Sequence, residues 1–202
     1  MEEKQLPVHL EGSYDSIYGN FGYRFAALLL DGIILAPISI GFLVYNSMNL
    51  NNIYLSILVT NLINLFYHIY LPTRFGATPG KLIMGLHILK MNGASITYND
   101  AFKRYLPNLL VALIAIINTL FAVAKADAAT YNEMSWMEQS QYLQSLNSNM
   151  FYIQVIIINA VFFTSFIIFM LNERKRSISD LSGDTAVVKK YYLKQIKEVM
   201  NK

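Results

Sequence analysis

Asp31 is a carboxylate inside a stretch of sequence that otherwise suits the interior of a membrane. It lies within Phe25–Tyr45, a segment long enough to span a bilayer and free of any other charged residue. A charged side chain at that depth costs roughly 2.5–3.5 kcal/mol on insertion scales, so it is usually paired, protonated or turned toward a polar cavity. Arg24 begins the same segment, and the spacing puts both residues on one helix face, about 10 Å apart along the axis. The pair predicts a polar site within a membrane.

Two roles are open for Asp31. One is a structural ion pair with Arg24 or another cation, although two turns of helix is a long reach that a water molecule or Asp180 would have to bridge. The other is a carboxylate that titrates or binds a cation at membrane depth. In that case Arg24 and Asp180 would set its protonation and its access from the cytoplasm.

A second polar group follows in the next apolar run. Asn61, Asn64 and His68 are spaced by three and four residues, so a helix presents them on one face. They can be hydrogen-bonding residues between helices, worth roughly 0.6–2 kcal/mol each. Alternatively they face Asp31 across a polar cavity, where His68 would carry protons because the ordinary pKa of histidine lies near neutrality.

Signatures of enzymatic chemistry are missing from the sequence. It has no cysteine, its three histidines are isolated, and it contains no phosphate-binding loop, HExxH motif or nucleophile elbow. We therefore expect no enzyme activity, no cofactor and no metal cluster.

The elements that must position these residues are four membrane-spanning helices. The chain has 202 residues, of which 54% are hydrophobic and only 14% charged, against roughly 25% charged in soluble domains. Its four longest apolar runs each approach the length that a spanning helix needs. They cover about residues 24–45, 53–71, 105–124 and 150–171. The sequence predicts an all-α membrane protein that forms a single domain over residues 1–202.

The distribution of charge predicts the orientation. Only Lys125 of the 16 basic residues lies outside residues 1–24, 72–104 and 172–202. By the positive-inside rule the 72–104 loop, the 172–202 tail and both termini are cytoplasmic, and the 125–149 loop is external. A basic cytoplasmic face favours anionic lipid headgroups as partners rather than nucleic acid. We expect a multi-pass protein of the cell (plasma) membrane.

The connections contain local structure. Lys81–Thr97 reads as a β-hairpin between the second and third helices, with its turn at Asn92-Gly93. In the external loop, Ser135 and Glu138 have the spacing of a capping box, which predicts a short helix. Tyr191–Met200 has apolar residues on one face and lysines elsewhere, which predicts an amphipathic helix on the membrane surface.

Several of these motifs together resemble the RDD family of small prokaryotic membrane proteins, named for an arginine and two aspartates. In that family the arginine begins the first transmembrane helix and the first aspartate lies within it, as Arg24 and Asp31 do here. The second aspartate follows the last helix in an Arg-x-x-x-Asp element, which Arg176–Asp180 matches, followed by a Thr-Val-Val-like run at 185–188. Ser179 stands where the family often has histidine.

The loop after the second helix also resembles the family. Thr78-Pro79-Gly80-Lys81 fits its Thr-x-Gly-Lys stretch, and Gly85–Ile88 fits the following Gly-Leu-x-Val-like element. The resemblance implies a transport role, because some members are linked to cation/proton antiport.

Two functions follow as expectations. The first is a small-cation/proton transporter, Na⁺/H⁺ antiport-like, in which Asp31 binds cation and proton in turn. Because four helices enclose little space, we expect a homo-oligomer with a pathway between protomers. The second is a membrane accessory, assembly or lipid-binding module without transport, in which Arg24, Asp31 and Asp180 form a structural clasp.

Overall fold

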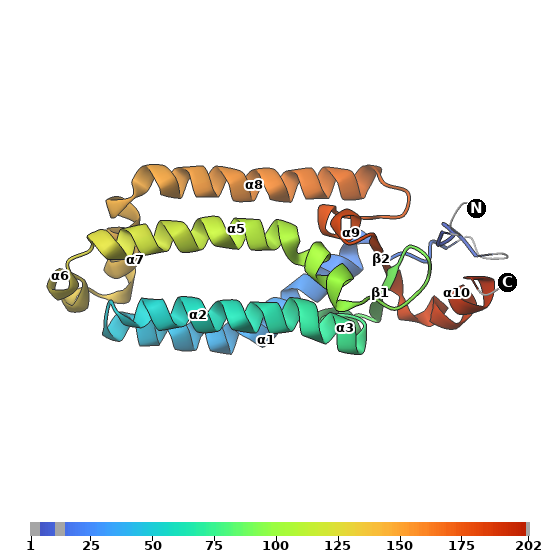
Figure 1. Ribbon diagram of the computed structural model, residues 1–202, viewed down its shortest axis with the longest axis horizontal. Coiled ribbons are helices and arrows are strands. Elements are labelled where there is room, and N and C mark those ends of the chain that lie inside the picture. Colours follow the sequence, from blue (N-terminus) through green and yellow to red (C-terminus); the bar gives the residue numbers. More distant parts are fainter. Residues whose placement is uncertain (1–4, 11–14, 201–202) are drawn as a thin grey trace. The chain divides into compact units, whose positions relative to one another are not determined.

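Long helices dominate the structure, a computed structural model that describes residues 5–10 and 15–200 (Figure 1). Four of them, within the described residues, are long and apolar enough to cross a membrane. The candidate membrane spans are Phe21–Met48 (α1), Asn52–Ile83, Tyr98–Lys125 (α5) and Ser148–Leu171 (α8). Each of the four predicted spans lies inside one of them. The prediction of a helical membrane protein with four spans is therefore confirmed.

The second span is not one regular helix. It begins with α2 (Asn52–Leu65), continues through a π-helical turn η1 (Phe66–Tyr70) and ends as α3 (Leu71–Phe75). Gly76 then takes a left-handed φ of 86°, which stops α3. The chain restarts as α4 (Pro79–Ile83), where Pro79 suits the first turn because no N–H is needed there.

The chain divides into two compact units. Unit 2 comprises residues 35–64 and 108–162, and unit 1 falls within residues 1–34, 65–107 and 163–202. Unit 2 includes two short helices, α6 (Ala128–Glu133) and α7 (Trp136–Leu146). The predicted capping box at the start of α7 is confirmed, since Glu138 accepts from the backbone N–H of Ser135 at 2.8 Å.

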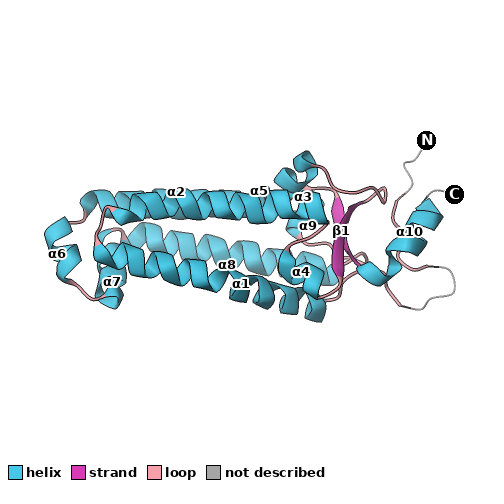
Figure 2. Ribbon diagram, turned by 90° about the horizontal axis from the view of Figure 1, so that it is seen from below, coloured by secondary structure: helices cyan, strands magenta, loops and turns pink. Residues whose placement is uncertain are grey.

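Unit 1 contains a two-stranded antiparallel sheet (Figure 2). Strand β1 (Leu86–Lys90) pairs with β2 (Thr185–Lys189), so that Leu86 lies opposite Lys189. The predicted small antiparallel sheet is present, but the predicted partner of β1 is wrong. The segment after the Asn92-Gly93 turn makes an isolated bridge, between Leu89 and Ser95, and β2 is the partner strand instead. The Ala186-Val187-Val188 run of β2 supplies buried apolar residues to both faces of the ladder, which the short segment after Gly93 does not offer.

The two faces of the sheet pack against different parts of unit 1. One face, with Leu86, Ile88 and Val187, packs on Ala27 of α1 and Ala101 of α5. The other face, with Leu89, Ala186 and Val188, is covered by Leu6, Ile17 and Tyr18 of the N-terminal segment and by Tyr192 and Ile196.

The C-terminal helix is part of this second core. After a 3₁₀ turn η2 (Lys190–Tyr192), helix α10 (Leu193–Met200) buries Ile196 completely against the sheet. The apolar face that predicted a membrane-surface anchor is therefore covered by the protein itself, because the N-terminal segment and β2 supply matching apolar side chains.

The Gly76→Ala substitution tests the turn that separates α3 from α4. A Cβ at this position would lie 1.7 Å from Cε1 of His87, and the positive φ strains any residue with a side chain. We expect a loss of about 2 kcal/mol or more in the free energy of unfolding. Thermal unfolding in detergent measures it, with Gly41→Ala as the control because a Cβ there meets nothing within 4 Å. Equal melting temperatures for both variants would contradict this account.

Candidate functional site

Asp31 accepts three hydrogen bonds from neutral donors in unit 1. The Tyr67 hydroxyl donates to Oδ1 at 2.5 Å, the Gly80 backbone N–H donates to Oδ1 at 2.6 Å, and the Thr78 hydroxyl donates to Oδ2 at 2.7 Å. Tyr67, Thr78 and Gly80 are buried, and Asp31 is partly buried. The carboxylate of α1 therefore holds the π-helical turn and the start of α4 together.

Local backbone geometry brings these donors to Asp31. The π-helical turn at Phe66–Tyr70 changes the phase of the helix, and Tyr67 lies within it. Thr78 is extended and makes no side-chain cap to its own helix. The N–H of Gly80 in the first turn of α4, which needs a partner from outside the helix, is satisfied by the carboxylate of α1 instead.

Asp31 makes no direct ion pair with any cation of the described residues. Among the described residues, no lysine, arginine or histidine nitrogen forms an ion pair with its carboxylate within 4 Å. A cation is reached through Thr78, whose hydroxyl oxygen accepts a 3.3 Å hydrogen bond from Nζ of Lys81. Asp31 is thus a carboxylate inside a spanning helix held by neutral groups.

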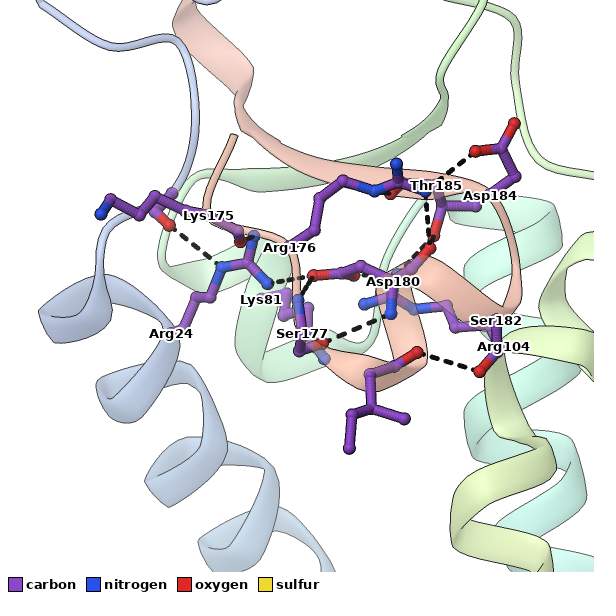
Figure 3. Close-up of polar contacts among 12 residues, drawn as sticks. Arg24, Lys81, Arg104, Lys175, Arg176, Ser177, Asp180, Ser182, Asp184 and Thr185 are labelled. Atoms are coloured by element: carbon purple, nitrogen blue, oxygen red, sulfur yellow. Dashed lines mark hydrogen bonds and ion pairs between the residues drawn. The ribbon is translucent and has the colours of Figure 1, made fainter. Parts of the chain in front are cut away.

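Asp180 has the opposite environment (Figure 3). Its side chain is fully buried and lies between two guanidinium groups, with Nη1 of Arg24 at 2.6 Å from Oδ2 and Nη1 of Arg104 paired with Oδ1. The backbone N–H of Ser177 also donates to Oδ2, at 2.9 Å, as part of the capping box of α9 (Ile178–Ser182). We call Arg24, Arg104 and Asp180 the Asp180 clasp.

The two arginines carry the clasp into the neighbouring elements. Arg24 also donates to the carbonyl oxygens of Gly19 and Lys175, at 3.0 and 2.6 Å. Arg104 donates to the hydroxyl of Thr185, the first residue of β2, at 2.6 Å. The start of α1, the first part of α5 and the segment after α8 are thereby joined at one buried charge.

A second layer of contacts surrounds the clasp. Arg176 donates to the carbonyl oxygen of Thr185 at 2.9 Å and pairs with Asp184, also at 2.9 Å (Figure 3). These contacts fix the turn between α9 and β2.

The electrostatics of Asp180 follow from this geometry. Burial by itself raises the pKa of a carboxyl group, but here the Arg104 and Arg24 guanidiniums and the Ser177 N–H outweigh it. The pKa of Asp180 is consequently held well below its usual range. The carboxylate stays ionised, as a structural anion, at any pH near neutrality.

The predicted site residues separate into groups. Arg24 and Asp180 are brought together directly, whereas Arg24 and Asp31 form no ion pair. His68 lies beside the Asp31 site: its ring stacks on Tyr105 at 5.4 Å and meets the edge of the Tyr67 ring at the same distance.

The two asparagines of the predicted polar stripe lie elsewhere. Asn61 and Asn64 belong to unit 2, where each donates to the carbonyl oxygen one turn earlier in its own helix, that of Ile57 and of Thr60 respectively. Asn64 and Thr60 line a separate cavity of about 470 Å³ within unit 2.

Sequence reasoning missed Tyr67 and the role of Arg104, and it treated Thr78 and Gly80 as motif residues without a partner. A threonine directly before Pro79 signals a helix start, so the α4 terminus was detectable. Nothing local to Tyr67 or Arg104 identifies their partners, which lie 36 and 76 residues away. Across residues 5–10 and 15–200, no group of three or more His, Cys, Asp or Glu side chains could hold a metal ion.

Comparison with known proteins identifies one match. The model of the RDD family matches residues 18–184, a range that contains Asp31, the four candidate spans and the Asp180 clasp. No curated protein and no solved structure matches the chain.

The Gly80→Ala substitution tests the close packing of α4 on α1. A Cβ here would lie 2.3 Å from the carbonyl oxygen of Ala27 and 2.6 Å from Oδ1 of Asp31. The two helices must move apart, at a cost of about 1–3 kcal/mol in the free energy of unfolding. Gly32→Ala, where a Cβ meets nothing within 4 Å, is the matched control for thermal unfolding in detergent. Unchanged stability of the Gly80 variant would show that the packing is not as described.

Removing the clasp carboxylate destabilises the fold. In the Asp180→Asn variant two partly buried arginines lose their counter-ion, and we expect a loss of about 3–5 kcal/mol or failure to accumulate in the membrane. Glu133→Gln is the control, because Glu133 is exposed and lies in unit 2, away from the contacts of the clasp. Since the pKa of Asp180 is lowered, its stabilisation is complete above the ordinary value of 3.8 and is lost as the pH falls through the lower folded value. Size-exclusion chromatography of the wild type at a series of pH values below 3.8 tests this prediction, which expects stability to fall as the pH is lowered.

Proposed function

The chain belongs to the RDD family, and for this membrane protein we propose a transport function: the exchange of a small cation, Na⁺, for protons at Asp31. The observation that carries the proposal is the absence of a cation within 4 Å of the Asp31 carboxylate among the described residues. An ionisable residue inside a spanning helix that lacks a direct counter-ion marks a functional site by default.

The contrast between the two carboxylates supports this assignment. Asp180 already has two guanidinium partners, so a further cation would gain little there. Asp31 has three neutral donors, which orient the carboxylate without neutralising its charge. A cation or a proton therefore gains more electrostatic attraction at Asp31.

The donors of Asp31 suit such an exchange. The hydroxyls of Tyr67 and Thr78 donate to the carboxylate now, but a hydroxyl can also accept or coordinate through its oxygen. When a cation arrives, rotation of these two O–H bonds would turn both oxygens toward it beside the carboxylate. Oxygen ligands of this kind suit small hard cations. His68, against the Tyr67 ring, is our candidate for carrying protons to the site.

The membrane arrangement is proposed on the basis of charge and exposure. We place the protein in the plasma membrane with both termini in the cytoplasm. All basic residues except Lys125 lie in the two terminal segments and the 72–104 loop, and basic segments stay on the cytoplasmic side. Anionic lipid headgroups are the expected partners of Lys189 and Lys190, which line a hollow with Tyr23 and Tyr191. The most apolar windows of α1 and α8 are only 6% buried, which leaves surface for lipid or for a second copy in a homo-oligomer.

A second candidate function is favoured by one observation. The Asp180 clasp joins α1, α5 and the segment after α8 around a buried charge, as expected of a rigid accessory or assembly module. If Asp31 is part of the same structural device, the protein needs no transport activity.

The Asp31→Asn variant separates these functions. Asparagine keeps the shape and can still accept hydrogen bonds but cannot carry the charge, so we expect normal folding and loss of sodium-driven proton movement in proteoliposomes. Measurements are pH-dye fluorescence for protons and ²²Na uptake for sodium, with Glu133→Gln as the control because Glu133 is exposed and lies in unit 2. Full coupled flux in the Asp31 variant would rule out the transport proposal. Failure of this variant to fold would favour the structural module.

A further inference from the structure

Lys81 is an ammonium with few partners in a crowded, charged region. It belongs to α4 and is partly buried. Of the three N–H donors that Nζ carries, one has a partner among the described residues, the Thr78 hydroxyl at 3.3 Å. No carboxylate of those residues lies within 4 Å of it. Lys81 is therefore held loosely, unlike the arginines of the neighbouring clasp.

The charges that face Lys81 come from every side of the site. They are Asp31 and Arg24 on α1, His68 on η1, Arg104 on α5 and Asp180 on α9. Figure 3 shows Lys81 in the same cluster as Arg24, Arg104 and Asp180. Because both arginines are already directed at Asp180, Lys81 is the lysine or arginine of this described cluster that remains to balance Asp31.

Thr78 connects the two. Its hydroxyl accepts from Nζ of Lys81 and donates to Oδ2 of Asp31, so the ammonium lies two hydrogen bonds from the carboxylate. Asp31, Asp180, Arg24, Arg104 and Lys81 together already carry one net positive charge. A sodium ion at Asp31 would add a second in a poorly hydrated site, where like charges repel strongly.

From this geometry we propose that Lys81 is the internal counter-ion of Asp31, which an incoming cation replaces, and that the exchanged proton leaves from Lys81. The proposal rests on cation exchange at Asp31 and names the group that couples it to protons. When Na⁺ binds, Lys81 passes from R–NH₃⁺ to R–NH₂ and releases H⁺, so the charge of the site stays constant. When Na⁺ leaves, Nζ takes up a proton and balances Asp31 again.

The identity of the residue matters for this role. Lysine carries a compact charge on a flexible stem and can lose its proton in a buried site, whereas arginine stays charged. The alternative is that Lys81 is a structural cation whose positive charge alone is needed. Arginine would fill that structural role and would fail in exchange.

The test uses the full chain in vesicles of phosphatidylglycerol and phosphatidylcholine, with a sodium gradient as the driving force. ²²Na uptake and proton release are measured together for wild type, Lys81→Gln, Lys81→Arg and the control Lys103→Gln, since Lys103 is exposed on α5. We expect about one proton per sodium ion in the wild type and in the control, because one charge replaces another.

The two Lys81 variants should differ from each other. Lys81→Gln should still take up sodium, but with roughly tenfold fewer protons released per ion and a new dependence on membrane potential, because its site has no proton to exchange. Lys81→Arg should lose roughly tenfold or more of the sodium flux, because its charge cannot leave.

Each outcome decides between the proposals. Unchanged proton coupling in Lys81→Gln, or full exchange by Lys81→Arg, overturns the role of Lys81 and leaves exchange at Asp31 standing. If Lys81→Gln fails to fold, the arginine variant alone makes this decision. Absence of sodium-driven proton movement in the folded wild type overturns the transport function, and the role of Lys81 with it.

Discussion

One buried carboxylate between two arginines organises unit 1. Asp180 is inaccessible to solvent, and a charge in that position is tolerated only when its partners are held in good geometry. Arg24 and Arg104 come from the starts of two spanning helices, and Asp180 comes from the segment after a third. The requirement to neutralise this charge therefore fixes the starts of α1 and α5 and the segment after α8 relative to β2 within unit 1.

The sheet depends on this constraint. Arg104 bonds to Thr185 and Arg176 bonds to the carbonyl of the same residue, so β2 starts at a point that the clasp has fixed. Side chains then alternate along β2. Val187 points to the core that contains Ala27 and Ala101, and Ala186 and Val188 point to the core formed with the N-terminal segment and α10. The electrostatic contact sets the position, and apolar burial on both faces of the strand supplies most of the stabilisation.

The two aspartates of the family motif have different physical roles because their surroundings differ. Asp180 is saturated by cations, which makes it a fixed part of the framework. Asp31 is oriented by hydroxyl and backbone donors that leave its charge uncompensated by direct contact. A rigid ion pair and a carboxylate held by neutral donors thus occur in the same unit, and the ion pair joins the helix ends.

Properties that depend on composition and local spacing could be read from the sequence: four apolar runs of spanning length, the Ser135 capping box, and Arg24, Asp31 and Asp180 as polar residues that need partners. The partners themselves were decided by the tertiary structure. Arg24 meets Asp180 and not Asp31, because its guanidinium points to the segment after α8 while Asp31 lies two turns further along α1. The π-helical turn that directs Tyr67 to Asp31, and the pairing of β1 with a strand beyond two further spans, have no local signal because both depend on contacts between distant residues. Asn61 and Asn64 satisfy their amides within their own helix, which spacing alone could not distinguish from lining a site.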